Sequence, residues 1–178
     1  MQLTDALLDL CSNRLPSIIA IDGPAGAGKT TLANNLALAM STSFRVHVVH
    51  MDDLYNGWDK ALGEDLTRTL ASLVQSHLAA KPLTYSRFNW ASSEFDEAIT
   101  HPVADILILE GVGCGQSAIR ENLASLLWID IDYNQGLARV LERDGENLEK
   151  QMQQWLVQQE QHFRVEGTQN AADFILTT

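Results

Sequence analysis

Apolar residues along the chain follow two alternating patterns, short continuous runs and longer stretches with helical spacing. The continuous runs cover 17–21, 45–50, 105–109, 126–131 and 174–177, and their length and β-branched content are typical of strands buried on both faces. Helical spacing extends over 4–13, 29–40, 64–78, 134–143 and 148–163. Strands that alternate with helices form parallel sheets covered on both sides. The pattern therefore predicts an α/β protein of three layers, α/β/α, around a five-stranded, mainly parallel sheet.

One long stretch, 81–101, shows neither pattern. It contains Pro82, four aromatic residues and many polar ones, so we expect a long irregular loop, and loops of that length are usually functional or mobile. The chain has no internal repeat, low-complexity tract or linker, which favours a single domain over residues 1–178.

Composition and charge narrow the class of protein. The 178 residues are 46% hydrophobic and 20% charged, which is ordinary for a globular domain with a real core. The net charge is −11, and the 12 Lys and Arg residues are scattered, so a nucleic-acid partner is not expected. The first ten residues lack a basic region and no apolar run has the length of a membrane span, so we expect a cytoplasmic protein without a membrane partner. The sequence indicates nothing about the oligomeric state.

The most informative segment is Gly23-Pro24-Ala25-Gly26-Ala27-Gly28-Lys29-Thr30, which fits the G-x-x-x-x-G-K-[ST] pattern of a phosphate-binding loop, or P-loop. Glycines let successive N–H groups turn around a phosphate, and the helix that follows adds its N-terminal dipole. Lys29 would place a cation against the phosphates and Thr30 would offer a hydroxyl to Mg²⁺. We therefore expect ATP and Mg²⁺ to bind here, through Gly23, Ala25, Gly26, Ala27, Gly28, Lys29, Thr30 and Thr31.

Carboxylates follow two other predicted strands. Asp52 and Asp53 come directly after 45–50, where they could act as a general base or a metal contact, or merely cap a turn. Glu110 ends the apolar run 105–109, the arrangement that orders Mg²⁺ in many nucleotide sites, although a plain turn carboxylate is the alternative. Asp105 begins that strand, lies at its far end from the site and is expected to be structural.

Two arginines, Arg139 and Arg143, lie four residues apart on one predicted helix. Arginines stabilise the negative charge of a transferred phosphoryl group. A solvated pair bonded to neighbouring glutamates is the alternative.

With these four elements in place, the sequence resembles the uridine kinase and phosphoribulokinase-like branch of the P-loop kinases, and in particular a compact bacterial group of uridine kinase-like proteins. The matching pieces are Gly-Pro-Ala-Gly-Ala-Gly-Lys-Thr-Thr, Met-Asp-Asp-Leu-Tyr, Ile-Leu-Ile-Leu-Glu-Gly and Arg139-x-x-x-Arg143-Asp144, and they span 18–144. By this resemblance Asp52 takes the proton from the acceptor hydroxyl, with Asp53 beside it. Arg139 and Arg143 would belong to a lid near 139–150 that closes over the phosphates.

The resemblance also places an acceptor pocket. Phe88-Asn89-Trp90 stands where the family has a Tyr-Asp-aromatic segment, and the missing hydroxyl and carboxylate leave the acceptor open. Aromatic residues in the two segments that would form this pocket could stack on a base or cover a sugar, or could fold onto the core. The acceptor-binding candidates are Asp53, Tyr55, Arg87, Phe88 and Trp90. Trp58 and Tyr85 belong to the same aromatic group, and His162 is a further candidate on the last long helix.

The sequence therefore predicts an ATP-dependent kinase that transfers the γ-phosphoryl group to a hydroxyl of a small, nucleoside-like acceptor. One alternative is a kinase for another small alcohol or a nucleoside monophosphate. The other is a nucleotide-binding switch with slow hydrolysis, which would have no need of a base such as Asp52.

Overall fold

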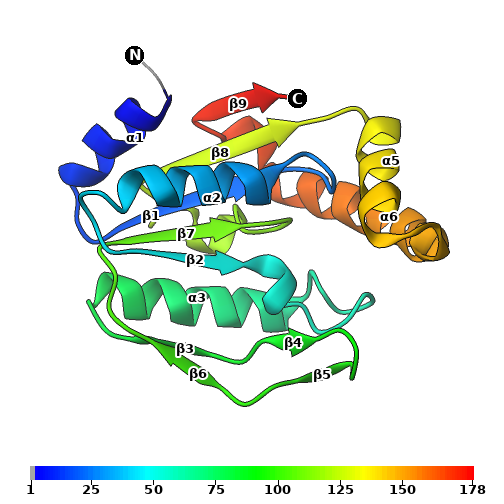
Figure 1. The fold of residues 1–178 in the computed structure, drawn as a ribbon, viewed down its shortest axis with the longest axis horizontal. Coiled ribbons are helices and arrows are strands. Elements are labelled where there is room, and N and C mark those ends of the chain that lie inside the picture. The colour runs from blue at the N-terminus through cyan, green and yellow to red at the C-terminus, as the bar shows by residue number, and fades with distance from the viewer. Residues whose placement is uncertain (1–2) are drawn as a thin grey trace.

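A central sheet of parallel strands organises the chain, in a computed structural model that describes residues 3–178. Within these residues five strands pair in the order β2–β7–β1–β8–β9, and all their arrows point the same way in Figure 1. The strands are β1 (Ser17–Asp22), β2 (Val46–His50), β7 (Ile106–Glu110), β8 (Ser125–Asp130) and β9 (Phe174–Thr177). In β1, the middle strand, Ile19 pairs with Ile108 of β7 and Ser125 of β8, and every residue is buried.

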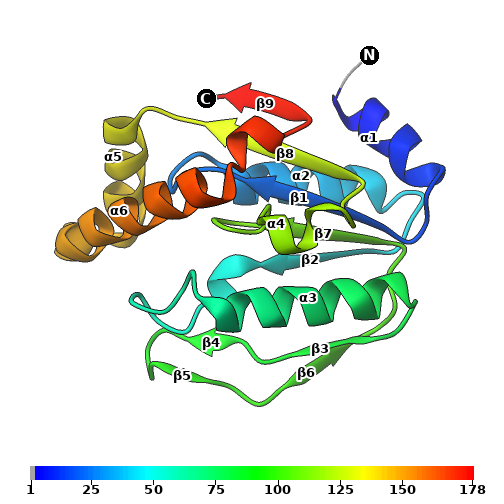
Figure 2. The same ribbon diagram turned by 180° about the vertical axis from the view of Figure 1, so that it is seen from behind.

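Helices cover both faces of the sheet, as the three-layer prediction requires. The α-helices are α1 (Leu3–Ser12), α2 (Lys29–Met40), α3 (Glu64–Leu78), α4 (Ser117–Arg120), α5 (Tyr133–Asp144) and α6 (Glu149–Glu166), and the short 3₁₀ turns are η1 (Met51–Asp53), η2 (Glu146–Leu148) and η3 (Gln169–Ala171). One face of the sheet packs against α1 and α2. The other face packs against α3, α4 and α6, which lie in front in the reversed view of Figure 2. The α/β class is thereby confirmed.

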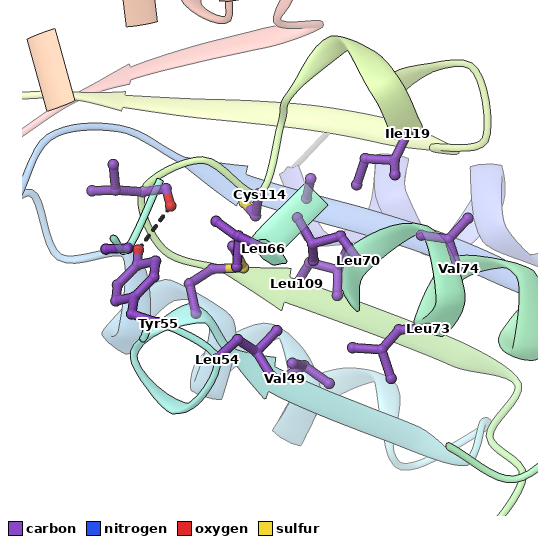
Figure 3. Close-up of a cluster of buried hydrophobic side chains, with 14 of the residues drawn as sticks. Val49, Leu54, Tyr55, Leu66, Leu70, Leu73, Val74, Leu109, Cys114 and Ile119 are labelled. Carbon is purple, nitrogen blue, oxygen red and sulfur yellow. Dashed lines mark hydrogen bonds between the residues drawn. The ribbon is translucent and has the colours of Figure 1, made fainter. Parts of the chain in front are cut away.

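Alternate strand residues supply the two hydrophobic clusters. Ile19 and Ile108 point to the α1–α2 side, whereas Leu109 points to the side of α3. Figure 3 shows this second cluster, where Leu70 of α3 lies against Leu109 and Tyr55 donates its hydroxyl proton to the carbonyl of Val112, at 2.7 Å. Because both faces of each strand are buried against a layer of helices, continuous apolar runs are the expected sequence for these strands.

The segment 81–101, expected to be an irregular loop, instead forms two small antiparallel pairs, so that prediction is wrong. These are β3 (Leu83–Tyr85) with β6 (Ile99–His101), and β4 (Phe88–Asn89) with β5 (Glu94–Phe95), beyond α3 at the lower edge of Figure 1. Strands of two or three residues are too short to display a period of two. Their pairing depends on contacts that the local sequence does not reveal, such as the side-chain hydrogen bond between Thr84 and Thr100.

The predicted lid region falls on the corner between two helices. Asp132 caps α5 by accepting hydrogen bonds from the amides of Asn134 and Gln135. Gly145, at φ +103°, ends α5, and the chain turns through η2 into α6. The single domain proposed for 1–178 stays a prediction, and its first two residues lie outside the described ones. No helix between residues 3 and 178 combines the length and the apolar character needed to cross a bilayer.

The parallel arrangement brings the carboxyl ends of all five strands to one edge of the sheet. The P-loop follows β1, Asp52 and Asp53 follow β2, and Glu110 ends β7. Ligands of open α/β sheets bind beyond this edge. Asp105 lies at the opposite edge, where it accepts hydrogen bonds from the Arg45 guanidinium and from the Arg45 backbone amide, in keeping with the structural role expected for it.

A half-buried histidine on β2 predicts how stability responds to acid. The ring of His47 lies 4.3 Å from the ring of His101 and its Nε2 lies 3.3 Å from the Tyr85 hydroxyl, and burial followed by the neighbouring His101 lowers the pKa of His47 to about 4. Between pH 6.5 and 4 the unfolded chain binds a proton at this position that the folded chain does not bind, so the folded state loses stability as the pH falls through that window.

We expect His47→Gln to remove about 1–2 kcal/mol of this acid-induced loss, since the group is only half-buried. Urea unfolding of the parent and the variant at a series of pH values from 7 to 4 measures the difference. Parallel curves over the whole range would contradict the prediction.

Candidate functional site

The P-loop is a tight turn whose shape depends on glycine. Gly26 has a φ of +80°, and a Cβ placed on it would lie 2.3 Å from the carbonyl oxygen of Gly136 in α5. A Cβ on Gly28 would meet no atom within 4 Å, so the loop is open beside the first turn of α2. The amides of a first helical turn have no partner within the helix and the helix dipole favours an anion there, so this open side fits a phosphate group.

Lys29 lies against the loop that precedes it. Its Nζ donates to the carbonyl oxygens of Gly23 and Pro24, both at 2.7 Å, and the residue is only 8% exposed. Burial lowers the pKa of Lys29, while the negative charges of Asp22, Glu110 and Asp52 oppose that shift. Lys29 thus lies among three carboxylates, which places its cation at the centre of the candidate site.

Asp22, at the end of β1, is a site residue that the sequence reasoning missed. Its fully buried carboxylate accepts hydrogen bonds from the amides of Gly23 at 2.8 Å, Gly113 at 3.0 Å and Gly115 at 2.8 Å. Burial raises the pKa of Asp22, and the hydrogen bonds and Lys29 act against that change. The available signal was the one used for Glu110, a carboxylate that ends an apolar strand.

Glu110 joins the P-loop helix to β2. Its Oε1 accepts the hydroxyl proton of Thr30 at 3.1 Å and lies 2.5 Å from Nδ1 of His50. The hydrogen bond to Glu110 raises the pKa of His50, and only 5% of Glu110 is exposed. The structure therefore brings together Thr30 and Glu110, two of the three metal-binding candidates.

Asp52, in η1, lies near Glu110 and Lys29. The residue is exposed, yet its carboxylate lies among the crowded strand ends, so burial and then the charge of Glu110 raise the pKa of Asp52. The positive charges of Lys29, Arg143 and His50 act in the opposite direction. A carboxylate with a raised pKa, next to a phosphate-binding loop, is suited to accept a proton.

The β4–β5 pair is tied to this end of β2 by two contacts. Arg87 forms an ion pair of 2.9 Å with Asp53, and the Trp90 indole donates to the backbone carbonyl of Asp52 at 3.0 Å. Asn89 does not face the site, because its side-chain oxygen accepts from the amides of Ala91 and Ser92 within the turn. Both side-chain contacts thus come from Arg87 and Trp90, and neither comes from Phe88 or Asn89, the two positions that depart from the family segment.

The aromatic candidates divide into buried and accessible ones. Tyr55 is 2% exposed and Phe88 is 6% exposed, so both pack inside, whereas Trp90 is 40% exposed. The ring of Trp90 meets the rings of Trp58 at 5.2 Å and Phe88 at 5.0 Å. Trp155 of α6, which was not predicted from the sequence, adds a third indole to Trp58 and Trp90, and we call these three side chains the aromatic wall. The ring centroid of Trp155 lies 6.1 Å from that of Trp58 and 5.2 Å from that of Tyr55. The wall offers a ring-sized ligand the surfaces of Trp58 and Trp90.

Two other acceptor candidates, Tyr85 and His162, pack against groups other than Trp58 and Trp90. Tyr85 is 8% exposed and belongs to the group of rings around His47. His162 lies behind Gly113, and its buried Nε2 has no hydrogen-bond partner within 3–178. Burial lowers the pKa of His162, while the negative charges of Asp22 and Glu166 act against that shift.

The two arginines of α5 reach different parts of the site. Arg139 donates to the carbonyl of Gly26 at 3.3 Å and to the Thr178 hydroxyl at 3.2 Å. Arg143 makes a two-pronged contact with Asp144, which is the first cause of its raised pKa, and the charges of Asp52 and Glu110 add to the shift. Arg139 thus lies at the P-loop, and Arg143 is within electrostatic reach of the carboxylates.

The remaining P-loop candidates are placed by their neighbours. The amide of Ala25 donates to Oε1 of Gln159 in α6 at 3.0 Å, and the carbonyl of Ala27 accepts from the Thr178 hydroxyl at 3.3 Å. Thr31 is exposed on the first turn of α2. Gln159 and Thr178 carried no recognisable signal, because they lie 134 and 151 residues along the chain from their partners.

The oxygen atoms present fit Mg²⁺. Among residues 3–178 no three His, Cys, Asp or Glu side chains gather into a site that could hold a metal by themselves. Magnesium in nucleotide sites usually takes one or two protein oxygens and completes its shell with water and phosphate oxygens. The adjacent oxygens of Thr30 and Glu110 match that demand.

Comparison with known proteins points the same way. No family model matches the chain. The chain is similar to a protein named uridine kinase from Lactobacillus helveticus (strain DPC 4571), with 28% identity over 182 residues, which is 90% of this chain and 86% of the relative. The resemblance to P-loop kinases of the uridine kinase type, and the prediction of a phosphotransferase, are thereby confirmed.

Solved structures support the fold. A possible uridine kinase from Bacillus stearothermophilus superposes with a TM-score of 0.65 at 21% identity, covering 99% of this chain and 100% of that one. A proposed fructose transport system kinase from Silicibacter sp. TM1040 gives a TM-score of 0.72 at 18% identity, covering 98% and 99%. At such identities the likeness establishes the α/β fold of the P-loop kinases.

The close contact between Gly26 and Gly136 predicts that a methyl group added at Gly26 weakens ATP binding. Gly26→Ala combines a left-handed backbone with a clash against a carbonyl, so the loop must shift and its affinity for ATP should fall on the order of 10–100-fold. Titration with a fluorescent ATP analogue measures the change.

Gly167→Ala is the matched control, because Gly167 also has a positive φ but its Cβ would meet nothing within 4 Å. It should lower stability by about 1 kcal/mol and leave ATP affinity unchanged. If Gly26→Ala bound ATP as tightly as the parent, the glycine would not be required for the cradle.

Proposed function

We propose that this chain, which resembles uridine kinases over nearly its whole length, is an ATP-dependent kinase that transfers the γ-phosphoryl group to a hydroxyl of a small, nucleoside-like acceptor. One observation carries the proposal. The accessible carboxylate of Asp52 lies in the same electrostatic group as Lys29 of the P-loop, beside the Thr30 and Glu110 oxygens. A potential base is therefore next to a potential phosphate site.

In the proposed reaction the acceptor oxygen attacks the γ-phosphorus, the bond from that phosphorus to the β–γ bridging oxygen breaks, and ADP leaves. The proton of the acceptor hydroxyl passes to the Asp52 carboxylate, whose raised pKa makes it a better base. Lys29 and the P-loop amides hold the phosphates, and Arg143 adds positive charge on the side of Asp52. Most of the acceleration comes from positioning and charge stabilisation.

Mg²⁺ would be held by Thr30 and Glu110, with Asp52 near it, and when bound it neutralises charge on the phosphate oxygens. His50 holds Glu110 in place from β2. The cytoplasmic location expected from the sequence remains a prediction.

A nucleoside-like acceptor is favoured by the wall of Trp58 and Trp90 beside Asp52, since indole rings can stack on a base. The name of the curated relative supports the same class of acceptor. Asp53 and Arg87, held together at 2.9 Å, offer a carboxylate and a guanidinium for the sugar hydroxyls or the base edge.

The second candidate function is a kinase for a different small alcohol, and the position of the Asn89 side chain supports it. The carboxylate that the family has at this position is replaced by an amide engaged within its own turn, so one of the usual acceptor contacts is absent from 88–90. A nucleotide-dependent switch is disfavoured, because it would not use an accessible base beside the phosphate site.

A coupled assay of ADP formation with Mg-ATP tests the proposal against uridine, cytidine, sugars and small alcohols. A large increase of rate with a pyrimidine nucleoside is expected. An increase only with another alcohol would keep the kinase and reject the nucleoside. No increase with any acceptor, despite measurable ATP binding, would favour the switch.

Asp52→Asn should lower the rate of transfer by about 10²–10⁴-fold while ATP affinity stays close to the parental value, because the variant removes a base and no P-loop contact. Lys29→Ala should lower both the rate of transfer and the affinity for ATP. Initial rates and ATP titrations on the purified variants separate the two effects.

Asp59→Asn, an exposed carboxylate in the neighbouring turn, is the control and should behave as the parent. Transfer at the parental rate by Asp52→Asn would show that Asp52 is not the base.

A further inference from the structure

A cavity lies behind the P-loop, on the face of the sheet opposite α2. It has a volume of about 420 Å³, opens to solvent, and is lined by β8, the start of α5, α6 and the η3 turn. Figure 2 shows α6 passing across this side of the sheet towards β8 and β9. A volume of this size is in the range of small-molecule sites.

The cavity is separate from the proposed active site. It touches the P-loop only at Pro24 and Ala25, and its lining includes none of Lys29, Asp52 and Glu110. The aromatic wall beside Asp52 is formed by Trp58, Trp90 and Trp155, none of which lines the cavity. The mechanism proposed above gives this space no role.

The chemistry of the lining is aromatic and carboxamide. Trp128 and Phe163, whose ring centroids are 4.6 Å apart, form an apolar surface together with Leu156. Gln159 and Asn170 bring carboxamides to the same space, and Gln169 adds another. Aromatic rings stack on nucleobases, and a carboxamide pairs its donor and acceptor with the edge of a base.

The charges of the lining disfavour phosphate. Asp132 and Glu160 are acidic, and Arg164 is the one cationic side chain among the lining residues, all of which belong to the described part of the chain. A phosphorylated ligand would add negative charge to a lining that already carries an excess of it. An uncharged ring with hydrogen-bonding edges is therefore preferred over a nucleotide.

We propose that this cavity is a second binding site, which takes the base of an unphosphorylated nucleoside. The base stacks on Phe163, whose ring stands at 79° to the buried ring of Trp128, and its edge is bonded by the carboxamides of Gln159 and Asn170. Gln159 is 5% exposed and is held in place by the amide of Ala25, so its carboxamide is pre-oriented. The same hydrogen bond joins the cavity to the backbone of the P-loop.

Nuclear magnetic resonance of the ¹⁵N-labelled chain, 19.7 kDa in mass, tests the proposal without requiring phosphate transfer. The probes are uridine, cytidine, adenosine and guanosine, each titrated in the presence of saturating Mg²⁺ and a non-hydrolysable ATP analogue. The four tryptophan indole signals, assigned with Trp→Phe variants, report the two sites separately. We expect at least one nucleoside to shift the signals of the Trp128 indole and the Ala25 amide saturably.

Variants identify the contacts. Gln159→Leu and Asn170→Ala should each weaken this binding about tenfold or more, because each removes a base-edge contact. Asn170 lies exposed on the rim, so its variant tests the site even if Gln159→Leu disturbs the P-loop. Gln154→Leu, exposed on the same helix and outside the cavity, should bind as the parent does.

Three results would overturn the proposal. Shifts confined to the indoles of Trp58, Trp90 and Trp155 would place the nucleoside only at the acceptor site. A shift of the Trp128 indole by the ATP analogue alone, with no further shift when a nucleoside is added, would assign the cavity to the nucleotide. No saturable shift of Trp128 with any of the four nucleosides would exclude a nucleoside site there.

Discussion

The buried carboxylate of Asp22 is the contact on which the rest of the site depends. A negative charge removed from water is costly unless hydrogen bonds and opposite charge replace the solvent, and here three backbone amides and the nearby Lys29 do so. One amide belongs to the P-loop and two belong to the segment that follows Glu110. A single side chain therefore holds the phosphate loop and the β7 segment in one arrangement.

The helices beyond β8 are joined to the same loop from the other side. The backbone of α5 at Gly136 approaches Gly26 so closely that no side chain fits between them, and Gln159 of α6 accepts the amide of Ala25. The region expected to act as a lid, 139–150, lies between these two contacts, and Arg139 at its start donates to the carbonyl of Gly26. If α5 and α6 moved toward a bound phosphate, the contacts of Gly136 and Gln159 with the loop would have to be kept or replaced. The positions of Arg139 and Arg143 on α5 therefore depend on the shape of the P-loop.

The parts of this arrangement that the sequence reveals are those encoded locally. Continuous apolar runs identified the five parallel strands, and the glycine pattern of 23–30 predicted the P-loop. The position of Glu110 after an apolar run placed it at the edge formed by the carboxyl ends of the strands. The β3–β6 and β4–β5 pairs were missed because strands of two or three residues have no readable period. Gln159 was missed because its partner, Ala25, is 134 residues away and a lone glutamine on a helix carries no signal.

The burial of Tyr55 and Phe88 is likewise not encoded in the local sequence, and it bears on the choice of acceptor. Aromatic residues near a site are equally suited to line it or to pack beneath it, and only the course of the chain decides which occurs. Here Phe88 packs against Trp90, and Tyr55 packs against Trp155, which in turn meets Trp58. Trp90 is bonded to the backbone of Asp52 itself. The wall of the proposed acceptor pocket is therefore held directly against the segment that carries the proposed base. A change in acceptor among related chains can then arise from the packing beneath Trp90 as readily as from the residues that touch the acceptor.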